Sequence, residues 1–226
     1  MVEPNPKAAQ VVSLRGNVKV TRDDWIAVAN DVLISQGIDQ VKILNLSERL
    51  DVSRSSFYWY FKSRQALLNA LLDAWRTSNT QSFIDACDAP AETITEAVCN
   101  LFRCFVDPAL FDPQLDFAIR EWSRRSGPVR AVVDSADTDR LEAVARMFER
   151  HDYPPQEAEV RARILYYMQI GYYALELSEP LEKRLSLVRG YLLGFTGQDA
   201  ADAEIEALGA YARAAQSRLA LSSKGE

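Results

Sequence analysis

The sequence predicts an all-α protein with around nine or ten helices, and three observations support this fold class. Apolar residues recur with the 3.6-residue period of a helix along most of the chain. Short segments rich in proline, glycine and aspartate separate these helical patterns. No strand-like alternation of any length and no internal repeat occurs. With 226 residues, the chain is long enough to bury a sizeable core.

The first twenty residues differ from the rest of the chain. They hold two early prolines, mixed polar residues and no sustained period, which predicts a flexible, mostly disordered N-terminal arm over residues 1–20. The arm carries Lys7, Arg15 and Lys19. It is either an ordinary solvated tail or an arm that follows DNA phosphates or the minor groove.

A first helix is expected to begin near Thr21 and to end at Gly37. Thr21 is a suitable N-cap, and Asp23 and Asp24 follow in the first turn, where the helix dipole favours acidic groups. Gly37 is typical of a C-cap. The apolar side of this helix should hold the next two helices in place; it consists of Trp25, Ile26, Ala29 and Leu33.

Residues 41–64 read as two very short helices joined by a tight turn, at about 44–50 and 54–60. Asp51 tolerates the left-handed conformation and can end the first of them. Ser53 can accept a hydrogen bond from the free N–H groups that open the second. Phe57 and Phe61 lie on the inward side. This pattern describes a helix-turn-helix.

The outward side of the second short helix is rich in hydrogen-bonding, aromatic and basic groups, which suit base edges, thymine methyls and phosphates of double-stranded DNA. Residues 42–64 contain five basic and two acidic residues, although the whole chain has a net charge of −6. An acidic body with a basic patch suits specific, steered DNA binding. The candidate DNA-binding residues are Lys42, Arg54, Ser55, Ser56, Tyr58, Trp59, Tyr60, Lys62 and Arg64.

After Ser63, an N-cap candidate, an apolar stripe predicts one long helix over about 64–86. Its first turn would face DNA and its far end would face the rest of the protein. Such a helix can couple two distant sites, because a shift of its far end tilts the second short helix, the recognition helix of the helix-turn-helix. Further helices are expected at about 92–106, 114–125, 127–150, 155–177, 181–195 and 203–221.

The sequence gives no support for a metal site, a cofactor or an enzyme. Three cysteines lack CxxC spacing and a single histidine, His151, is present, so no cluster supplies the ligands of a zinc ion. No glycine-rich phosphate loop occurs. Cys87, Cys99 and Cys104 are expected to be buried small apolar residues, with a redox sensor at Cys99 or Cys104 as the alternative.

Residues 21–72 resemble the DNA-binding domain of the tetracycline-repressor family of bacterial transcription regulators. The most specific part is the Tyr-x-x-Phe ending of the recognition helix, Tyr58 and Phe61, followed by Arg64. Departures from the family pattern are Ser47 for Ala, Asp51 for Gly, Tyr60 for His and Arg64 for Lys. The resemblance implies a helix-turn-helix domain over residues 21–67 and a larger helical ligand-binding and dimerisation domain over 68–226.

The resemblance also implies a homodimer and a pocket for a small-molecule inducer. Two recognition helices about 34 Å apart would meet successive major grooves of a palindromic operator. The helices that form the dimer in the family correspond here to segments that contain Tyr167, Gly171, Leu175, Leu187, Gly190, Tyr191 and Gly194. The candidate pocket residues are Phe83, Phe102, Phe105, Phe117, Arg120, Glu121, Trp122, Tyr166, Tyr167 and Tyr173.

Two hypotheses follow from these observations. The first is a cytoplasmic, ligand-responsive, homodimeric transcription regulator, in particular a repressor that a small molecule releases from a palindromic operator. The second is a ligand-binding or protein-interaction module whose helix-turn-helix no longer reads DNA. No signal peptide or membrane span is predicted, because polar residues interrupt every apolar run well short of about 18 positions.

Overall fold

The computed structural model describes residues 20–222, and all regular secondary structure in this range is helical, which confirms the predicted all-α class. The predicted N-terminal arm lies outside the described residues except for Val20. The elements are α1 (Arg22–Gln36), η2 (Ile38–Gln40), α2 (Ile43–Arg49), α3 (Arg54–Phe57), α4 (Arg64–Trp75), η3 (Arg76–Gln81), α5 (Ser82–Asp88), α6 (Ile94–Val106), α7 (Pro113–Ser123), α8 (Gly127–Glu149), α9 (Pro155–Ala174), α10 (Leu181–Thr196) and α11 (Asp202–Ser222).

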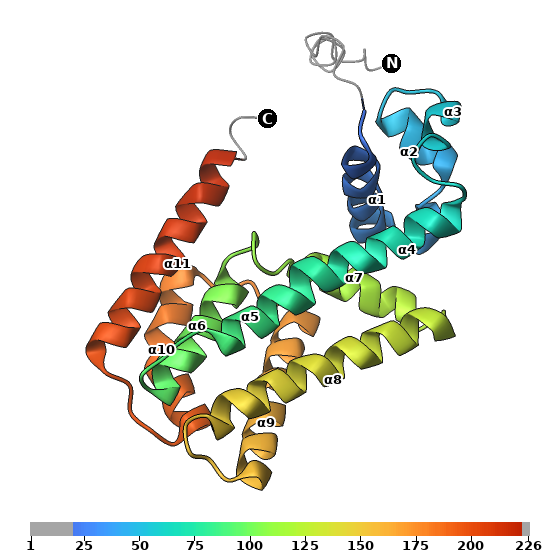
Figure 1. Cartoon of the computed structure of the whole chain (residues 1–226). Coiled ribbons are helices and arrows are strands. Elements are labelled where there is room, and N and C mark those ends of the chain that lie inside the picture. The colour runs from blue at the N-terminus through green and yellow to red at the C-terminus, as the bar shows by residue number, and fades with distance from the viewer. Residues whose placement is uncertain (1–19, 223–226) are drawn as a thin grey trace.

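Helices α1, α2 and α3 form a small group at one end of the molecule, and α4 runs from this group into the larger helical body (Figure 1). In the body, α8 packs along α9 and α11 packs along α6. Helix α7 contacts both α1 and α8, so it connects the small group to the body. The helix-turn-helix is therefore attached through two elements, α4 and α7.

The ends of α1 and α4 follow the capping rules that the sequence predicts. The Thr21 hydroxyl accepts from the backbone N–H of Asp24 while the Asp24 carboxylate accepts from that of Thr21, which completes a capping box. Gly37 ends α1 with φ 79°, a conformation that glycine adopts without steric cost. The Ser63 hydroxyl accepts from the N–H of Ala66 at the start of α4.

The predicted long helix over 64–86 contains a π-helical segment that its sequence pattern did not indicate. Helices α4 and α5 continue into each other through η3, whose extra backbone per turn turns Asn79 and Thr80 inward, where both are buried. The Asn79 amide donates to the carbonyl of Asp112 at 2.7 Å, and its oxygen accepts from the N–H of Asp112 at 3.2 Å. Tertiary hydrogen bonds thus hold the π segment against the start of α7.

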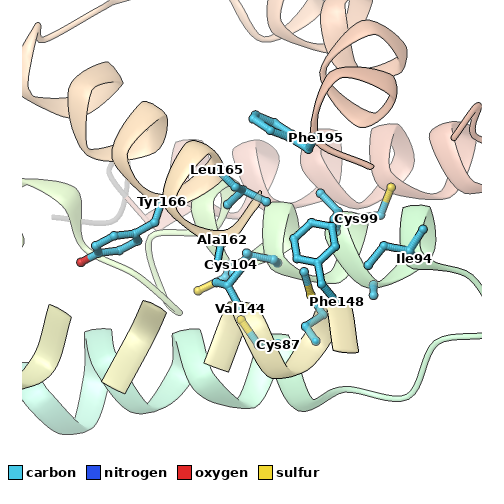
Figure 2. Packing of buried hydrophobic residues seen from close by; sticks show 14 of the residues in the cluster. Cys87, Ile94, Cys99, Cys104, Val144, Phe148, Ala162, Leu165, Tyr166 and Phe195 are labelled. Atoms are coloured by element: carbon cyan, nitrogen blue, oxygen red, sulfur yellow. The ribbon is translucent and has the colours of Figure 1, made fainter. Parts of the chain in front are cut away.

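Two hydrophobic clusters fill the interior. One joins the helix-turn-helix to α4, α7 and the first half of α8, around Trp25, Leu67, Trp75 and Trp122. The other lies among α5, α6, α8, α9, α10 and α11. Figure 2 shows Cys87, Cys99 and Cys104 within the second cluster, among aliphatic and aromatic side chains. The predicted domain boundary at residues 67 and 68 stays a prediction.

Candidate nucleic-acid interface and the cavity behind it

Two buried phenylalanines fix the orientation of the recognition segment (residues 54–61). Phe57 is fully buried with its ring edge-on to Trp25 at a centroid distance of 5.2 Å. Phe61, 4% exposed, stacks on Phe57 at 5.4 Å. Burial of a phenylalanine stabilises the fold by about 1.5–3 kcal/mol, and an aromatic pair adds about 0.5–1.5 kcal/mol. With both rings pointing inward, Tyr58 and Trp59 between them face solvent.

The side chains that face solvent are the ones that duplex DNA requires. Tyr58 is 59% exposed and Trp59 is 73% exposed, values that are unusual for large aromatic residues on a small helical domain. Basic and hydroxyl groups surround them. The exposed predicted residues are Lys42, Arg54, Ser55, Tyr58, Trp59 and Lys62.

The helix-turn-helix accommodates both unusual residues of its turn. Asp51 adopts φ 52°, as the sequence predicts for the residue that ends the first short helix. The buried Ser47 hydroxyl donates to the carbonyl of Leu44 at 2.8 Å, so it leaves no unsatisfied polar group at the helix contact. The N–H of Val52 donates to the carbonyl of Ser47 and closes the turn.

Some details of the predicted recognition helix were wrong. Helix α3 ends at Phe57 rather than residue 60, because Tyr58, Trp59 and Tyr60 form successive i→i+3 hydrogen bonds as the chain tightens. Ser53 occupies the N-cap, but its hydroxyl pairs with that of Ser55 at 2.8 Å instead of with a backbone N–H. Ser56 is only half-exposed and donates to the carbonyl of Ser53.

Two predicted DNA-binding residues, Tyr60 and Arg64, point into the domain. The Tyr60 hydroxyl donates to the carbonyl of Val20 at 2.7 Å. The Arg64 guanidinium donates through Nε to the carbonyl of Val41 at 2.5 Å and through Nη2 to that of Ile38 at 2.8 Å. Arg64 therefore ties α4 to the segment before α2, and its expected role of holding a phosphate stays a prediction.

A cleft of about 920 Å³ lies between the helix-turn-helix and the body. Its walls come from the end of α1 with η2, the end of α6, α7, the end of α9 and α11. A narrower pocket among α6, α9, α10 and α11 adjoins it, and both are lined by Phe105, Val106, Tyr172, Glu179, Leu181 and Arg184. The volume of the cleft is within the range of small-molecule sites.

Six predicted pocket residues line these cavities, and four do not. Those that line them are Phe102, Phe105, Phe117, Glu121, Trp122 and Tyr173. Phe83 and Tyr166 are instead packed in the second hydrophobic cluster. Tyr167 is 52% exposed on the outside of α9, so it lines neither cavity. Arg120 is engaged in an internal ion-pair network, which corrects its assignment as a ligand contact.

That network is buried and connects four elements. Asp116 accepts from Arg140, from Arg120 and from the indole N–H of Trp75, at 2.8 to 3.0 Å. Arg140, fully buried, also donates to the hydroxyl of Thr80 in the π segment at 2.9 Å. Burial alone would raise the pKa of Asp116, but the adjacent Arg140 and Arg120 outweigh it and lower that pKa.

The narrower pocket is lined by residues that the sequence did not single out, namely Gln169, Tyr172, Glu179 and Arg184; the last three also line the wide cleft. They sit at the end of α9, at its link to α10 and in the first turn of α10. An arginine on an amphipathic helix is usually solvated, so nothing in the local pattern distinguishes Arg184. The QIGYY sequence of α9 indicates a small-residue helix contact as readily as a cavity wall.

The outer side of α9 and α10 is apolar and open. Ile164, Tyr167 and Leu175 are 53%, 52% and 71% exposed. A Cβ atom added at Gly171, Gly190 or Gly194 would meet no atom within 4 Å. Of the other two predicted dimer residues on α10, Leu187 is half-buried and Tyr191 is exposed.

Other chemistries find little support in residues 20–222. All three cysteines are buried, and burial raises the pKa of Cys99 and of Cys104 to about 12, so neither forms a thiolate readily. Across the same residues, no group of three or more His, Cys, Asp or Glu side chains is arranged to hold a metal ion. None of the described helices combines the length and apolar character needed to span a membrane.

The comparisons with known proteins agree with this geometry. Residues 26–71 match the family described as "Bacterial regulatory proteins, tetR family". The tetracycline repressor protein class C of Escherichia coli is 38% identical over 61 residues, which are 27% of this chain and 28% of that repressor. The class A repressor from transposon 1721, also from Escherichia coli, is 36% identical over 61 residues and likewise 28% covered. The chain thus aligns with little more than a quarter of the length of these relatives.

Two solved structures share the fold over most of their length. GusR of Salmonella enterica superposes with a TM-score of 0.59 at 15% identity and covers 78% of this chain and 95% of that one. The ketosteroid transcriptional regulator KstR2 of Mycobacterium tuberculosis gives a TM-score of 0.60 at 14% identity, covering 83% and 98%. The matched family is described as one of regulatory proteins. Residues 26–71, which contain the helix-turn-helix, are thus similar to the tetR family of bacterial regulatory proteins.

Proposed function

We propose that this protein is a homodimeric regulator of transcription that binds a palindromic operator through the recognition segment. The observation that carries the proposal is the exposure of Arg54, Tyr58, Trp59 and Lys62 together on a segment that Phe57 and Phe61 anchor from behind. Solvent-exposed aromatic side chains cost free energy in an isolated protein, and a major groove offers thymine methyls and base edges to cover them.

The alternative, a helix-turn-helix that no longer reads DNA, rests on the acidic body and on Ser47 and Asp51. Both residues keep the turn intact, since Ser47 finds a backbone acceptor and Asp51 adopts the left-handed conformation. Exposed basic side chains at Lys42, Arg54 and Lys62 supply cations for phosphates. These features favour a working DNA reader.

A second copy of the chain is the expected partner for the outer side of α9 and α10. Val160, Ile164, Tyr167 and Gly171 recur at intervals of four, three and four residues, the spacing of a helix-packing seam. Open space at the three glycines permits close approach of a partner helix. Pairing through this face would give a four-helix interface and a two-fold axis that matches a palindromic operator.

The cleft behind the DNA-binding end is the proposed site of a small-molecule inducer. A ligand there would contact η2 and the end of α1 on one side and α7 on the other. Release from the operator requires that the ligand bind the DNA-incompetent arrangement more tightly, by about 1–3 kcal/mol for a typical coupling. Repression relieved by ligand is the simplest output of such coupling.

The test is selection of the purified protein against a random-sequence duplex pool at two salt concentrations, with sequencing of the bound fraction. We expect a palindrome with half-sites one helical turn apart and weaker binding at the higher salt. A pool without enrichment at either salt would favour the alternative, provided that mass spectrometry finds no co-purified small molecule in the preparation.

A further inference from the structure

We infer that the cleft and the narrower pocket beside it form one site for an organic monoanion, an apolar molecule with a single carboxylate. The carboxylate would be held in the narrower pocket, by Arg184 and Gln169, and the apolar body would lie in the wide cleft. This inference specifies the ligand class of the proposed function and rests on that function only for its regulatory meaning.

Arg184 is the first observation. Every other arginine from Arg76 to Arg218 makes an ion pair or a side-chain hydrogen bond in the structure. Among the described residues, the half-buried Arg184 guanidinium makes neither, and its carbon lies 5.5 Å above the ring of Tyr172. A partly desolvated cation without a partner favours an incoming anion, and the planar guanidinium matches a carboxylate in a two-point contact.

Gln169 is the second and independent observation. Its side chain is 92% buried, being 8% exposed, and it lines the narrower pocket. The amide nitrogen Nε2 makes no hydrogen bond of standard geometry, although it lies beside the hydroxyl of Tyr173. A buried amide donor with only a poorly aligned neighbour would be better satisfied by a ligand oxygen.

The charges around the site limit the ligand to one negative group. The wide cleft is lined by four carboxylates, Asp39, Glu121, Glu176 and Glu179, and by two arginines, Arg125 and Arg184. Arg125 already pairs with Asp39 at 3.5 Å. Repulsion from the remaining carboxylates acts on every negative group of a ligand and only Arg184 offsets it, so a polyanion such as a nucleotide is disfavoured more strongly than a monoanion.

The shape of the site places the two ends of the ligand. The narrower pocket, about 70 Å³, takes only a small group beside Gln169 and Arg184. The wide cleft of about 920 Å³ offers aromatic walls at Phe117, Trp122 and Tyr173 for an apolar body. That body would reach Ile34 and Ile38, so the ligand would bridge the body of the protein and its DNA-binding end.

The experiment measures binding of three matched probes to the full chain, without DNA, by isothermal titration calorimetry. The probes are decanoate, decan-1-ol and decyltrimethylammonium, which share the alkyl chain and differ in charge. We expect decanoate to bind at least tenfold more tightly than the alcohol and the ammonium. Tighter binding of the ammonium, or equal binding of all three, would overturn the inference.

Two variants assign the effect to the site. Arg184→Met keeps the apolar stem and removes the charge, and it should weaken decanoate binding at least tenfold while leaving decan-1-ol unchanged. Gln169→Leu should weaken decanoate by a smaller factor. Arg146→Met, an exposed arginine on α8 that lines neither cavity, is the control and should change nothing. Unchanged decanoate affinity in Arg184→Met would refute the assignment.

The ligand inference and the proposed function fail separately. If the duplex selection yields a palindrome but decanoate binds no more tightly than the other two probes, the proposed DNA binding is supported and the inferred ligand class is wrong. If decanoate binds as expected and no duplex is enriched, the site stands and the regulatory function is wrong. In the case that both hold, decanoate should weaken operator binding of the wild type and not of Arg184→Met.

Discussion

Replacing Asp116 by Asn tests the buried network that holds the π segment of the long helix. The substitution is isosteric and removes one charge, so the fully buried Arg140 keeps only neutral partners, namely the new amide oxygen and the hydroxyls of Thr80 and Tyr166. Breaking one side of a buried ion pair costs about 3–5 kcal/mol. For a chain of this size, that loss lowers Tm by roughly 6–20 °C.

The assay is urea denaturation followed by circular dichroism, with Asp134→Asn as the matched control. Asp134 pairs with Arg130 on the surface of α8 at 2.7 Å, and both side chains are more than half exposed. Loss of this exposed ion pair should change the free energy of unfolding by less than about 0.5 kcal/mol. If the free energy of unfolding of Asp116→Asn lay within 1 kcal/mol of that of the control, the view that this network stabilises the body would be refuted. Amide exchange of residues 76–81 should also accelerate, because the anchor of Thr80 is weakened.

Four further predictions follow from the described contacts. The pKa of Asp116 is lowered in the folded protein, so the ionised carboxylate stabilises the fold fully above the pKa of the unfolded chain, about 4, and this stabilisation is lost as the pH falls below that value. The free energy of unfolding, measured from pH 7 to 3, should therefore fall less in Asp116→Asn than in the wild type. Arg64→Ala should lower stability by about 1.5–3 kcal/mol in urea denaturation, through its two carbonyl contacts, and leave the salt dependence of DNA binding unchanged. Tyr167→Glu should convert a dimer into a monomer in light scattering, and an unchanged mass would move the interface elsewhere. Cys99→Ser/Cys104→Ser should leave oxidant sensitivity unaltered, because both thiols are buried with raised pKa values.

Much of the DNA-binding end was predictable because its signals are local. The capping box at Thr21, the glycine that ends α1 and the left-handed Asp51 each depend on a few neighbouring residues. The inward rings of Phe57 and Phe61 follow from helical spacing alone. These features place the exposed side of the recognition segment before any tertiary contact is known.

Features that depend on distant partners were not predictable in the same way. Arg64 and Tyr60 read as outward, basic and aromatic groups, and only carbonyls that folding brings close turn them inward. Arg140 reads as a solvated position on α8, yet its partners Thr80 and Asp116 come from segments 60 and 24 residues away. The π segment has the same origin, since it is stabilised by tertiary contacts rather than by its own sequence.

The residues that line the cavities were also only partly predictable from the sequence. Aromatic residues between the predicted helices indicated a pocket, and six of ten candidates line one. Spacing cannot separate an aromatic residue that lines a cavity from one that fills the core, as Phe83 and Tyr166 do. Nor can it show that Arg184, unlike the other arginines of the body, makes no ion pair or side-chain hydrogen bond with residues 20–222.

The central claim is that the recognition segment reads duplex DNA, and one titration tests it most directly. The affinity for the selected palindrome would be measured across a salt series for the wild type, Arg54→Ala, Lys62→Ala and the control Arg146→Ala. If each exposed cation contacts a phosphate in both subunits, each variant loses roughly 1.8 from the slope of log K against log salt. Arg54→Ala should also weaken binding at least tenfold if it reads a base edge. Slopes and affinities equal to those of the wild type in both variants would contradict the claim.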